Sequence, residues 1–172
     1  MVNKDGFIVA AGVHTEMIGK DVSNSDWFQN AIKKSGCSVS EMYFSENYND
    51  YTVSYSCRII DEKGSVIGVL STRFNWNYIY DILDKAKIGT KGEVYAINSK
   101  GIVIASRNKD EILKRNLIET YPEVQVAVSG DEYGYSIEME KDKLEGIIGY
   151  AHTKGYNSYR GKKWSVIVRE TF

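Results

Sequence analysis

The amino-acid sequence predicts an α+β protein made of two similar modules in series, each an antiparallel sheet with short helices. Three observations support this prediction. First, the segment VNKDGFIVAA at 2–11 resembles INSKGIVIAS at 97–106, so the pattern repeats after 97 − 2 = 95 residues. Second, apolar and β-branched runs flank short polar turns that end in glycine, as in hairpins. Third, helical segments lie between the hairpins of each half, which is typical of a sheet covered by helices on one face.

The first helix is expected at 27–34, in the stretch WFQNAIKK, with a Ser-Gly pair ending it. Good N-cap residues stand directly before it, namely Asn24, Ser25 and Asp26. Phe28, Ala31 and Ile32 follow the i, i+3, i+4 spacing of a buried stripe. Trp27 points about 100° away from Phe28 on a helix, so it faces something other than this stripe.

A further hairpin is expected in the first half, with strands at 49–60 and 66–74 on either side of the turn DEKG at 61–64. A helix over 75–89 then joins the halves, because apolar side chains recur at helical spacing at Trp76, Ile79, Ile82 and Leu83. The boundary falls near this helix, which gives modules at 2–86 and 87–172.

The second half repeats the plan after its first hairpin. Helical segments are expected at 108–120 and at 122–130, where Pro122 occupies a favourable first-turn position. A pair of strands flanks a turn at 141–143, and a last strand covers 163–170. The tyrosines of this half are interpreted as residues of the sheet and its gaps, namely Tyr95, Tyr133, Tyr135, Tyr150, Tyr156 and Tyr159.

Composition describes a globular chain without an obvious macromolecular partner. The net charge is −1, with 42% hydrophobic and 26% charged residues. Scattered basic residues argue against nucleic acid, which requires a concentrated basic face. The chain holds no apolar run of the roughly 18 to 20 residues that a membrane helix needs. Met1 directly before a predicted strand suggests a domain excised from a longer protein.

Catalytic and metal-binding motifs are not found in the sequence. No nucleophile elbow, phosphate-binding loop or zinc-protease motif occurs, so we expect neither an enzyme nor a cofactor. His14 and His152 have no ligand-spaced partners, so we expect no metal site. Cys37 and Cys57 form no Cys-x-x-Cys motif, and whether they form a disulfide stays open.

Arg73 is the most informative charge in the first half. Side chains alternate along a strand, so Val69, Ser71 and Arg73 share one face. If Arg73 enters a cavity, its guanidinium requires a carboxylate from the protein or from a ligand, because an unpaired buried charge is costly. The alternative is a surface arginine, paired with Glu46 or with nothing.

The preceding strand also alternates. One side carries Tyr51, Val53, Tyr55 and Cys57, and the other carries Thr52, Ser54, Ser56 and Arg58. Together with Tyr43, the aromatic side could offer phenol hydroxyls to a small polar ligand, which fits sites built from apolar walls and a few polar groups.

Three segments in order, DVSNSDWFQNAI, IIDEKGSVIGVL and GTKGEVYAINSKGIVIAS, resemble the double Cache (PDC-type, PAS-like) sensor domains of bacterial and archaeal membrane receptors. The resemblance covers nearly the whole chain. It implies tandem PAS-like modules, the first membrane-distal and usually ligand-binding, on the extracytoplasmic side of a histidine kinase or chemotaxis receptor. It also implies a long helix before the first strand, absent from this chain, which rises from a membrane span and supports a homodimer.

The resemblance also implies a site. Residues around the Trp-Phe helix start line the distal pocket in this family, where amino-acid binders carry an arginine at the position of Ser25 and an aspartate at that of Arg73. The positive charge is thus expected to have moved across the cavity, with Arg73 meeting the carboxylate of a small anionic or zwitterionic ligand. The candidate ligand-binding residues are Ser25, Trp27, Phe28, Tyr43, Tyr55, Ser71 and Arg73.

Trp27 has a second interpretation as a core or interface aromatic, because indoles are amphipathic. Two other functions also stay open: a structural or dimerisation spacer that binds no ligand, and a cytosolic PAS-type domain that holds flavin or haem. The second lacks a reactive Asn-Cys-Arg setting and a pocket histidine.

Overall fold

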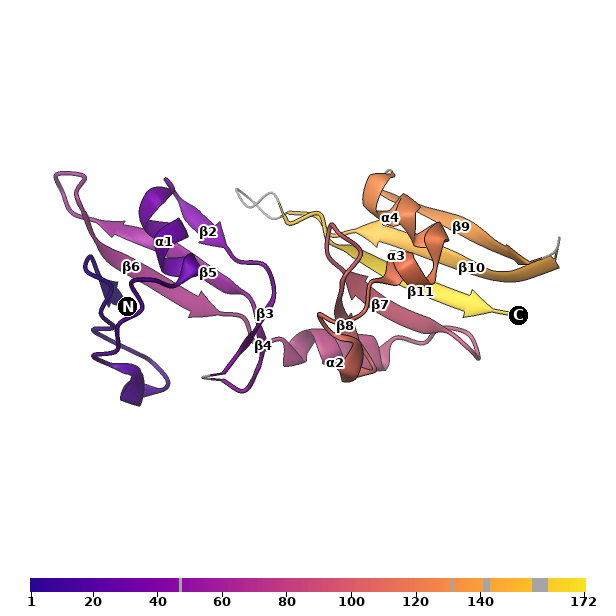
Figure 1. Cartoon of the computed structure of the whole chain (residues 1–172), viewed down its shortest axis with the longest axis horizontal. Coiled ribbons are helices and arrows are strands. Elements are labelled where there is room, and N and C mark those ends of the chain that lie inside the picture. The colour runs from indigo at the N-terminus through magenta and orange to yellow at the C-terminus, as the bar shows by residue number, and fades with distance from the viewer. Residues whose placement is uncertain (47, 131, 141–142, 156–160) are drawn as a thin grey trace. The chain divides into compact units, whose positions relative to one another are not determined.

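A computed structural model divides the chain into two compact units, Met1–Trp76 and Asn77–Phe172 (Figure 1). The structure describes residues 1–46, 48–130, 132–140, 143–155 and 161–172. Each unit holds an antiparallel sheet with short helices, which confirms the predicted α+β class. No helix of the described residues is long and apolar enough to cross a membrane.

The first unit is built on a sheet of order β1-β6-β5-β2, with all neighbours antiparallel. Its strands are β1 (Val2–Asn3), β2 (Cys37–Val39), β5 (Ser54–Ile60) and β6 (Val66–Arg73). A short hairpin of β3 (Tyr43–Ser45) and β4 (Asp50–Thr52) forms a separate two-stranded sheet. The helical elements are η1 (Thr15–Met17) and α1 (Asp26–Lys33).

Helix α1 covers one face of this sheet through the predicted stripe. Phe28 and Ala31 are buried and form a core cluster with Val2 and Val69, and Ile32 packs against it. Ser25 is the N-cap residue, although its hydroxyl does not cap the helix. Because Val69 lies in this core, alternation places Ser71 and Arg73 of β6 on the α1 side of the sheet.

The expected strand at 49–60 is interrupted at Val53. Thr52, Val53 and Ser54 are all buried, which strict alternation of faces does not allow. The Val53 carbonyl accepts from the Phe74 amide, and the Thr52 hydroxyl donates to the Phe74 carbonyl at 2.9 Å. The chain therefore changes sheets here, and β4 and β5 follow separate alternations.

The second unit has a five-stranded antiparallel sheet of order β8-β7-β11-β10-β9. The strands are β7 (Glu93–Ile97), β8 (Val103–Ser106), β9 (Tyr133–Glu140), β10 (Lys143–His152) and β11 (Ser165–Thr171). The helical elements are α2 (Asn77–Lys85), η2 (Lys109–Glu111), α3 (Leu117–Thr120), η3 (Pro122–Gln125) and α4 (Val126–Ser129). A core of Ile97, Val103, Leu117, Ile148 and Ile167 lies between the sheet and the short helices.

Helix α2 belongs to the second unit, whereas the sequence analysis drew the boundary after 86. The Arg107 guanidinium donates to the Leu83 carbonyl at 3.1 Å, so β8 and the loop after it hold the end of the helix. Tyr80 and Leu83 are buried, while Ile82 is 64% exposed. The expectation that Ile82 joins the apolar stripe was wrong, because Tyr80 takes the buried position one turn before Leu83.

The predicted repeat is visible in the hydrogen bonds of its turns. Asn3 and Asn98 use their side-chain oxygens in the same way, accepting from the amides two and four residues on. In both turns the asparagine carbonyl accepts from the amide of a glycine, Gly6 or Gly101, which has a positive φ of 95° or 81°. The turn at Asp61 has the same pattern. An Asx residue followed by glycine three positions later explains the recurrence.

The strand expected after the first turn does not form, whereas the described tyrosines that we assigned to the sheet of the second half lie in it. The apolar stretch after the first turn makes only isolated bridges, Val2 with Ile8 and Phe7 with Asp21, instead of a strand, because the amides of Val9 and Ala10 both turn to the Met1 carbonyl. Tyr95, Tyr133, Tyr135 and Tyr150 lie in the sheet as predicted. Tyr156, Tyr159 and Lys141 lie outside the described residues.

Candidate functional site

A guanidinium, an indole and a row of hydroxyls meet on the α1 side of the first sheet. Helix α1 presents Trp27, and the end of β6 presents Arg73, whose guanidinium carbon lies 4.8 Å from the centre of the Trp27 ring. Both side chains are half-buried. This is a cation–π contact, and it links the end of β6 to the first turn of α1.

The hydrogen bonds of Arg73 leave part of its guanidinium unsatisfied. Nη1 donates to the Ser71 hydroxyl at 2.5 Å and to the Thr72 carbonyl at 3.3 Å. Nε is buried and has no hydrogen-bond partner among the described residues. A buried donor on a charged group that lacks a hydrogen bond costs free energy, so this Nε–H group requires an acceptor. A carboxylate suits it best, because guanidinium and carboxylate geometries match.

Serine hydroxyls continue the polar row beneath α1. The Ser71 and Ser56 hydroxyls are hydrogen-bonded at 2.6 Å. The two residues lie directly opposite each other where β5 pairs with β6. Ser54, fully buried, bonds the Tyr43 hydroxyl at 2.8 Å. Each hydroxyl can both donate and accept, so the row can adapt to a neutral polar group.

The structure brings only part of the predicted site together. Trp27, Ser71 and Arg73 are in one cluster, with Tyr43 bonded to the adjacent hydroxyl row. Phe28 is a core residue at 3% exposure, in edge contact with Trp27. The Ser25 hydroxyl donates to the Val22 carbonyl at 2.6 Å and so serves the helix start.

Tyr55 lies on the other face of the sheet. It pairs with Thr72, whereas Ser54 and Ser56 pair with Arg73 and Ser71 on the α1 face. Its side chain is 37% exposed, and an aromatic wall made of Tyr43 and Tyr55 together therefore does not form.

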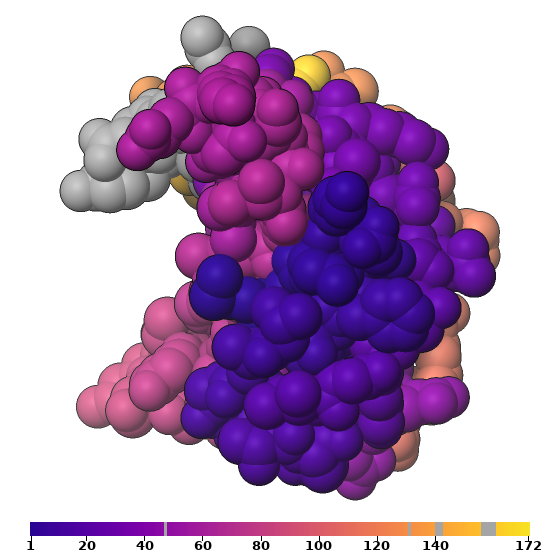
Figure 2. Space-filling model, turned by 90° about the vertical axis from the view of Figure 1, so that its left-hand side faces the viewer, coloured from indigo at the N-terminus to yellow at the C-terminus, as the bar shows by residue number. Residues whose placement is uncertain are grey.

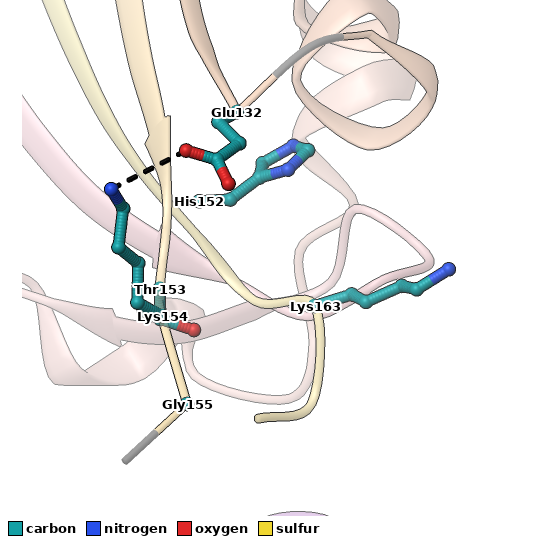
Figure 3. Close-up of a pocket in the computed structure, with 6 residues that line it drawn as sticks. All are labelled: Glu132, His152, Thr153, Lys154, Gly155 and Lys163. Carbon is teal, nitrogen blue, oxygen red and sulfur yellow. Dashed lines mark ion pairs between the residues drawn. The ribbon is translucent and has the colours of Figure 1, made fainter. Parts of the chain in front are cut away.

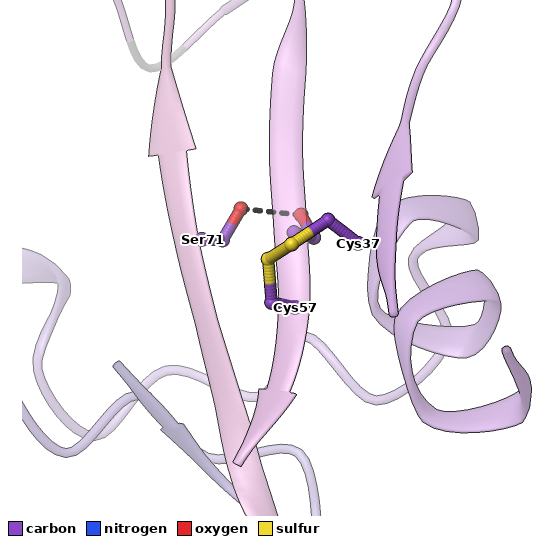
Figure 4. Close-up of a disulfide and its surroundings, with 4 residues drawn as sticks. Cys37, Cys57 and Ser71 are labelled. Atoms are coloured by element: carbon purple, nitrogen blue, oxygen red, sulfur yellow. Dashed lines mark hydrogen bonds between the residues drawn. A yellow bond between two sulfur atoms is a disulfide. The ribbon is translucent and has the colours of Figure 1, made fainter. Parts of the chain in front are cut away.

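A disulfide joins Cys37 of β2 to Cys57 of β5 beside this site (Figure 4). The two residues are directly paired across the strands, with Cα atoms 4.2 Å apart. Cys57 alternates with Ser56 and so lies on the face opposite the hydroxyl row. The bond closes the segment that carries Tyr43 and Ser54, and thereby ties the site to the sheet.

The second unit contains a charged cluster that the sequence analysis missed. Arg169 of β11 donates from Nε to Glu138 at 2.8 Å and from Nη1 to Glu93 at 2.9 Å. Its guanidinium carbon lies 4.2 Å from the centre of the Tyr121 ring. The one signal in the sequence is alternation, which puts Arg169 on the same face as the buried Ile167.

An arginine and a phenol in this cluster have raised pKa values. The bond to Glu138 raises the pKa of the Arg169 guanidinium, and burial opposes that rise. Burial raises the pKa of the Tyr95 phenol, as does the hydrogen bond of 2.9 Å that the phenol donates to Glu93. Glu138 and Glu93 each accept from Arg169, so this cluster leaves neither carboxylate without a donor among the described residues.

A pocket of about 300 Å³ opens elsewhere in the second unit (Figure 3). Its lining residues are Glu132, His152, Thr153, Lys154, Gly155 and Lys163. Glu132 pairs with Lys154 at 3.3 Å, and both side chains are exposed. The His152 Nε2 atom lies 2.8 Å from the Ala127 carbonyl, and Lys163 points away from the ion pair. Glu132, His152 and Thr153 already have partners, and this pocket has no buried donor left open like the Arg73 Nε among the described residues, so it is a weaker candidate than the Arg73 cluster.

The described residues contain no group of three or more acidic, histidine or cysteine side chains able to hold a metal ion. The N-terminal segment, indigo in Figure 2, lies at the surface of the first unit. Its exposed apolar side chains are Met1, Phe7, Val9, Val13 and Ile18.

Comparison with protein families gives one match over the whole chain. The family model described as a Cache domain matches residues 1–171. No curated protein sequence matches the chain.

Solved structures share the fold at low identity. An extracellular ligand-binding receptor from Desulfohalobium retbaense is 15% identical, with a TM-score of 0.73 over 98% of this chain and 29% of that one. The ligand-binding domain of the Pseudomonas fluorescens chemoreceptor CtaA with L-serine is 20% identical, at 0.63 over 89% and 63%. The ligand-binding domain of the Pseudomonas aeruginosa chemoreceptor PctC with GABA is 17% identical, at 0.67 over 88% and 63%. Extracellular domains of histidine kinases share the fold too. The chain thus spans less than two thirds of each of the three structures.

Proposed function

This chain belongs to the Cache domain family, and we propose that it is the extracytoplasmic ligand-sensing part of a membrane receptor, either a histidine kinase or a chemoreceptor. The first unit, as the membrane-distal module, binds a small carboxylate-bearing molecule. Its role is binding without catalysis. A membrane anchor and a homodimer formed through a helix before residue 1 belong to the same proposal.

The single observation that carries the binding proposal is the buried, partnerless Nε of Arg73. The guanidinium is fixed over Trp27 and held by Ser71, so its remaining donor is preorganised before any ligand arrives. A carboxylate that gains access to this buried atom forms a charge-assisted bond with an arginine that is already ordered.

The disulfide supports the extracytoplasmic location. Such bonds persist in oxidising compartments and are rare in the cytosol, where thiols are kept reduced. Cys37 and Cys57 are the two cysteines of the chain, and they are paired. The same observation disfavours a cytosolic PAS-type domain that holds flavin or haem.

Signalling would follow from a population shift. A ligand changes the balance of two packings only by its differential affinity for them. Arg73 ends β6, and Trp27 lies in the first turn of α1, so a ligand that engages both groups favours one placement of the helix on the sheet. The parent receptor would respond to that placement of the helix.

A thermal-shift screen over carboxylates, amino acids, amines and sugars tests the proposal. A ligand at 100 times its Kd adds about 2.7 kcal/mol to the free energy of unfolding, a shift that is readily measured. Stabilisation by a carboxylate compound supports the sensor function. If no compound in any class shifted the thermal unfolding transition, the chain would instead be a structural or dimerisation spacer that binds no ligand.

Replacing Arg73 by glutamine is expected to weaken a carboxylate ligand by about one to two decades in Kd, because one charged hydrogen bond contributes about 1.5 to 3 kcal/mol. Arg58→Gln is the matched control, since it removes one arginine from the partner strand of the same sheet. Isothermal titration calorimetry gives both Kd values. Equal affinities in the two variants would contradict the assignment.

A further inference from the structure

We infer that the ligand of the Arg73 site is a carboxylate whose neighbouring substituent is hydrogen or hydroxyl, and that an α-ammonium group is selected against. This inference rests on the proposed function and refines its ligand class. It follows from comparing the Arg73 cluster with the charged cluster of the second unit.

The two units place an arginine at the same position of the same strand. In the repeated hairpins, Val2 corresponds to Ile97. Val2 pairs with Val69 of β6, and Ile97 pairs with Ser165 of β11. Four residues further along, β6 carries Arg73 and β11 carries Arg169. Arg73 and Arg169 are therefore equivalent in register, although the sequences around them differ.

Both arginines lie against an aromatic ring, but only Arg169 is hydrogen-bonded to carboxylates of the described residues. Arg169 lies over Tyr121 at 4.2 Å, and its Nε donates to Glu138 at 2.8 Å. Arg73 lies over Trp27 at 4.8 Å, and its Nε has no partner within the part of the chain that the structure describes. The atom that a glutamate satisfies in the second unit is the atom left open in the first. In the second unit, the carboxylate of Glu138 therefore occupies the position beside Nε that we assign to a ligand carboxylate in the first unit.

No described carboxylate of the first unit completes Arg73 in this way. Its hydrogen bonds go to Ser71 and to the Thr72 carbonyl, and none of the ion pairs among the described residues involves it. In this proposal a ligand supplies the acceptor, and its carboxylate takes the place that Glu138 holds beside Arg169.

The surroundings of that carboxylate disfavour a second positive charge. An α-ammonium group beside that carboxylate would be held close to the guanidinium, and like charges repel each other appreciably in a half-buried site. The Trp27 face, which could otherwise attract a cation, is occupied by Arg73. The adjacent groups are the hydroxyls of Ser71 and Ser56, which suit a neutral hydroxyl as donor or acceptor.

Three ligands with one skeleton test this directly: propionate, L-lactate and L-alanine carry hydrogen, hydroxyl and ammonium beside the same carboxylate. We expect L-lactate and propionate to bind the intact domain, and L-alanine to bind about tenfold more weakly or worse. Calorimetry at one pH and one salt concentration gives the three Kd values. Arg73→Gln should weaken lactate and propionate, and the Arg58→Gln control should not.

The failures of the two proposals are distinguishable. L-alanine binding as tightly as L-lactate, and weakened by Arg73→Gln, would overturn the ligand class and leave the sensor function standing. Failure of all three carboxylates to bind would also overturn this inference. Only the absence of stabilisation across the full screen of compound classes would remove the sensor function itself.

Discussion

Glu138→Ala is expected to lower the free energy of unfolding of the second unit by about 3 kcal/mol, the lower end of the range for breaking a buried ion pair. Glu138 is 9% exposed and Arg169 is 18% exposed, so the arginine cannot recover full hydration when its partner is removed. The lower end applies because Glu93 still accepts from the guanidinium at 2.9 Å.

Hydrogen exchange of the β10 and β11 amides measures this loss within the second unit. Glu145→Ala is the matched control, because its side chain is exposed on β10 and we expect a change within about 0.5 kcal/mol. Glu138→Gln keeps an acceptor for Arg169 and should cost less than alanine. Equal protection in the alanine variant and the control would show that the cluster contributes little to stability.

Removing the disulfide should destabilise the first unit by roughly 3 kcal/mol. Cys37 and Cys57 are 20 residues apart, and closing a loop of that length restricts the unfolded chain by about this amount. The Cys37→Ala and Cys57→Ala double variant should therefore melt at a lower temperature than the wild type. A reducing agent should lower the wild-type transition and leave that of the double variant unchanged. An unchanged wild-type transition under full reduction would contradict the prediction.

Local patterns predicted much of the fold. The Asx-glycine turns at Asn3, Asp61 and Asn98 were evident because a turn is fixed by a few neighbouring residues. The position of helix α1 followed from its N-cap residues and the Ser-Gly pair after it, and its buried stripe followed from the spacing. The break at Val53 was not predicted, since it depends on bonds to Phe74, which follows a different strand.

The site was only partly predictable, because strand register is long-range information. Alternation within each strand was correct for Tyr55 and for Arg73 separately, but the sequence does not say which face of one strand matches which face of the other. The pair of Ser56 with Ser71 decides this and places Tyr55 on the other face. The Arg169 cluster was missed for the same reason, since its partners are 31 and 76 residues away.

The central claim is that a small carboxylate ligand binds in the first unit between Trp27 and Arg73. Nuclear magnetic resonance of the labelled domain, titrated with the best ligand from the screen, tests it most directly. The account predicts that the largest shifts occur at the Arg73 Nε–H, the Trp27 indole N–H and the Ser71 amide, with the Nε–H signal moving as its missing acceptor arrives. Shifts confined to the second unit, for example around Glu132 and His152, would contradict it.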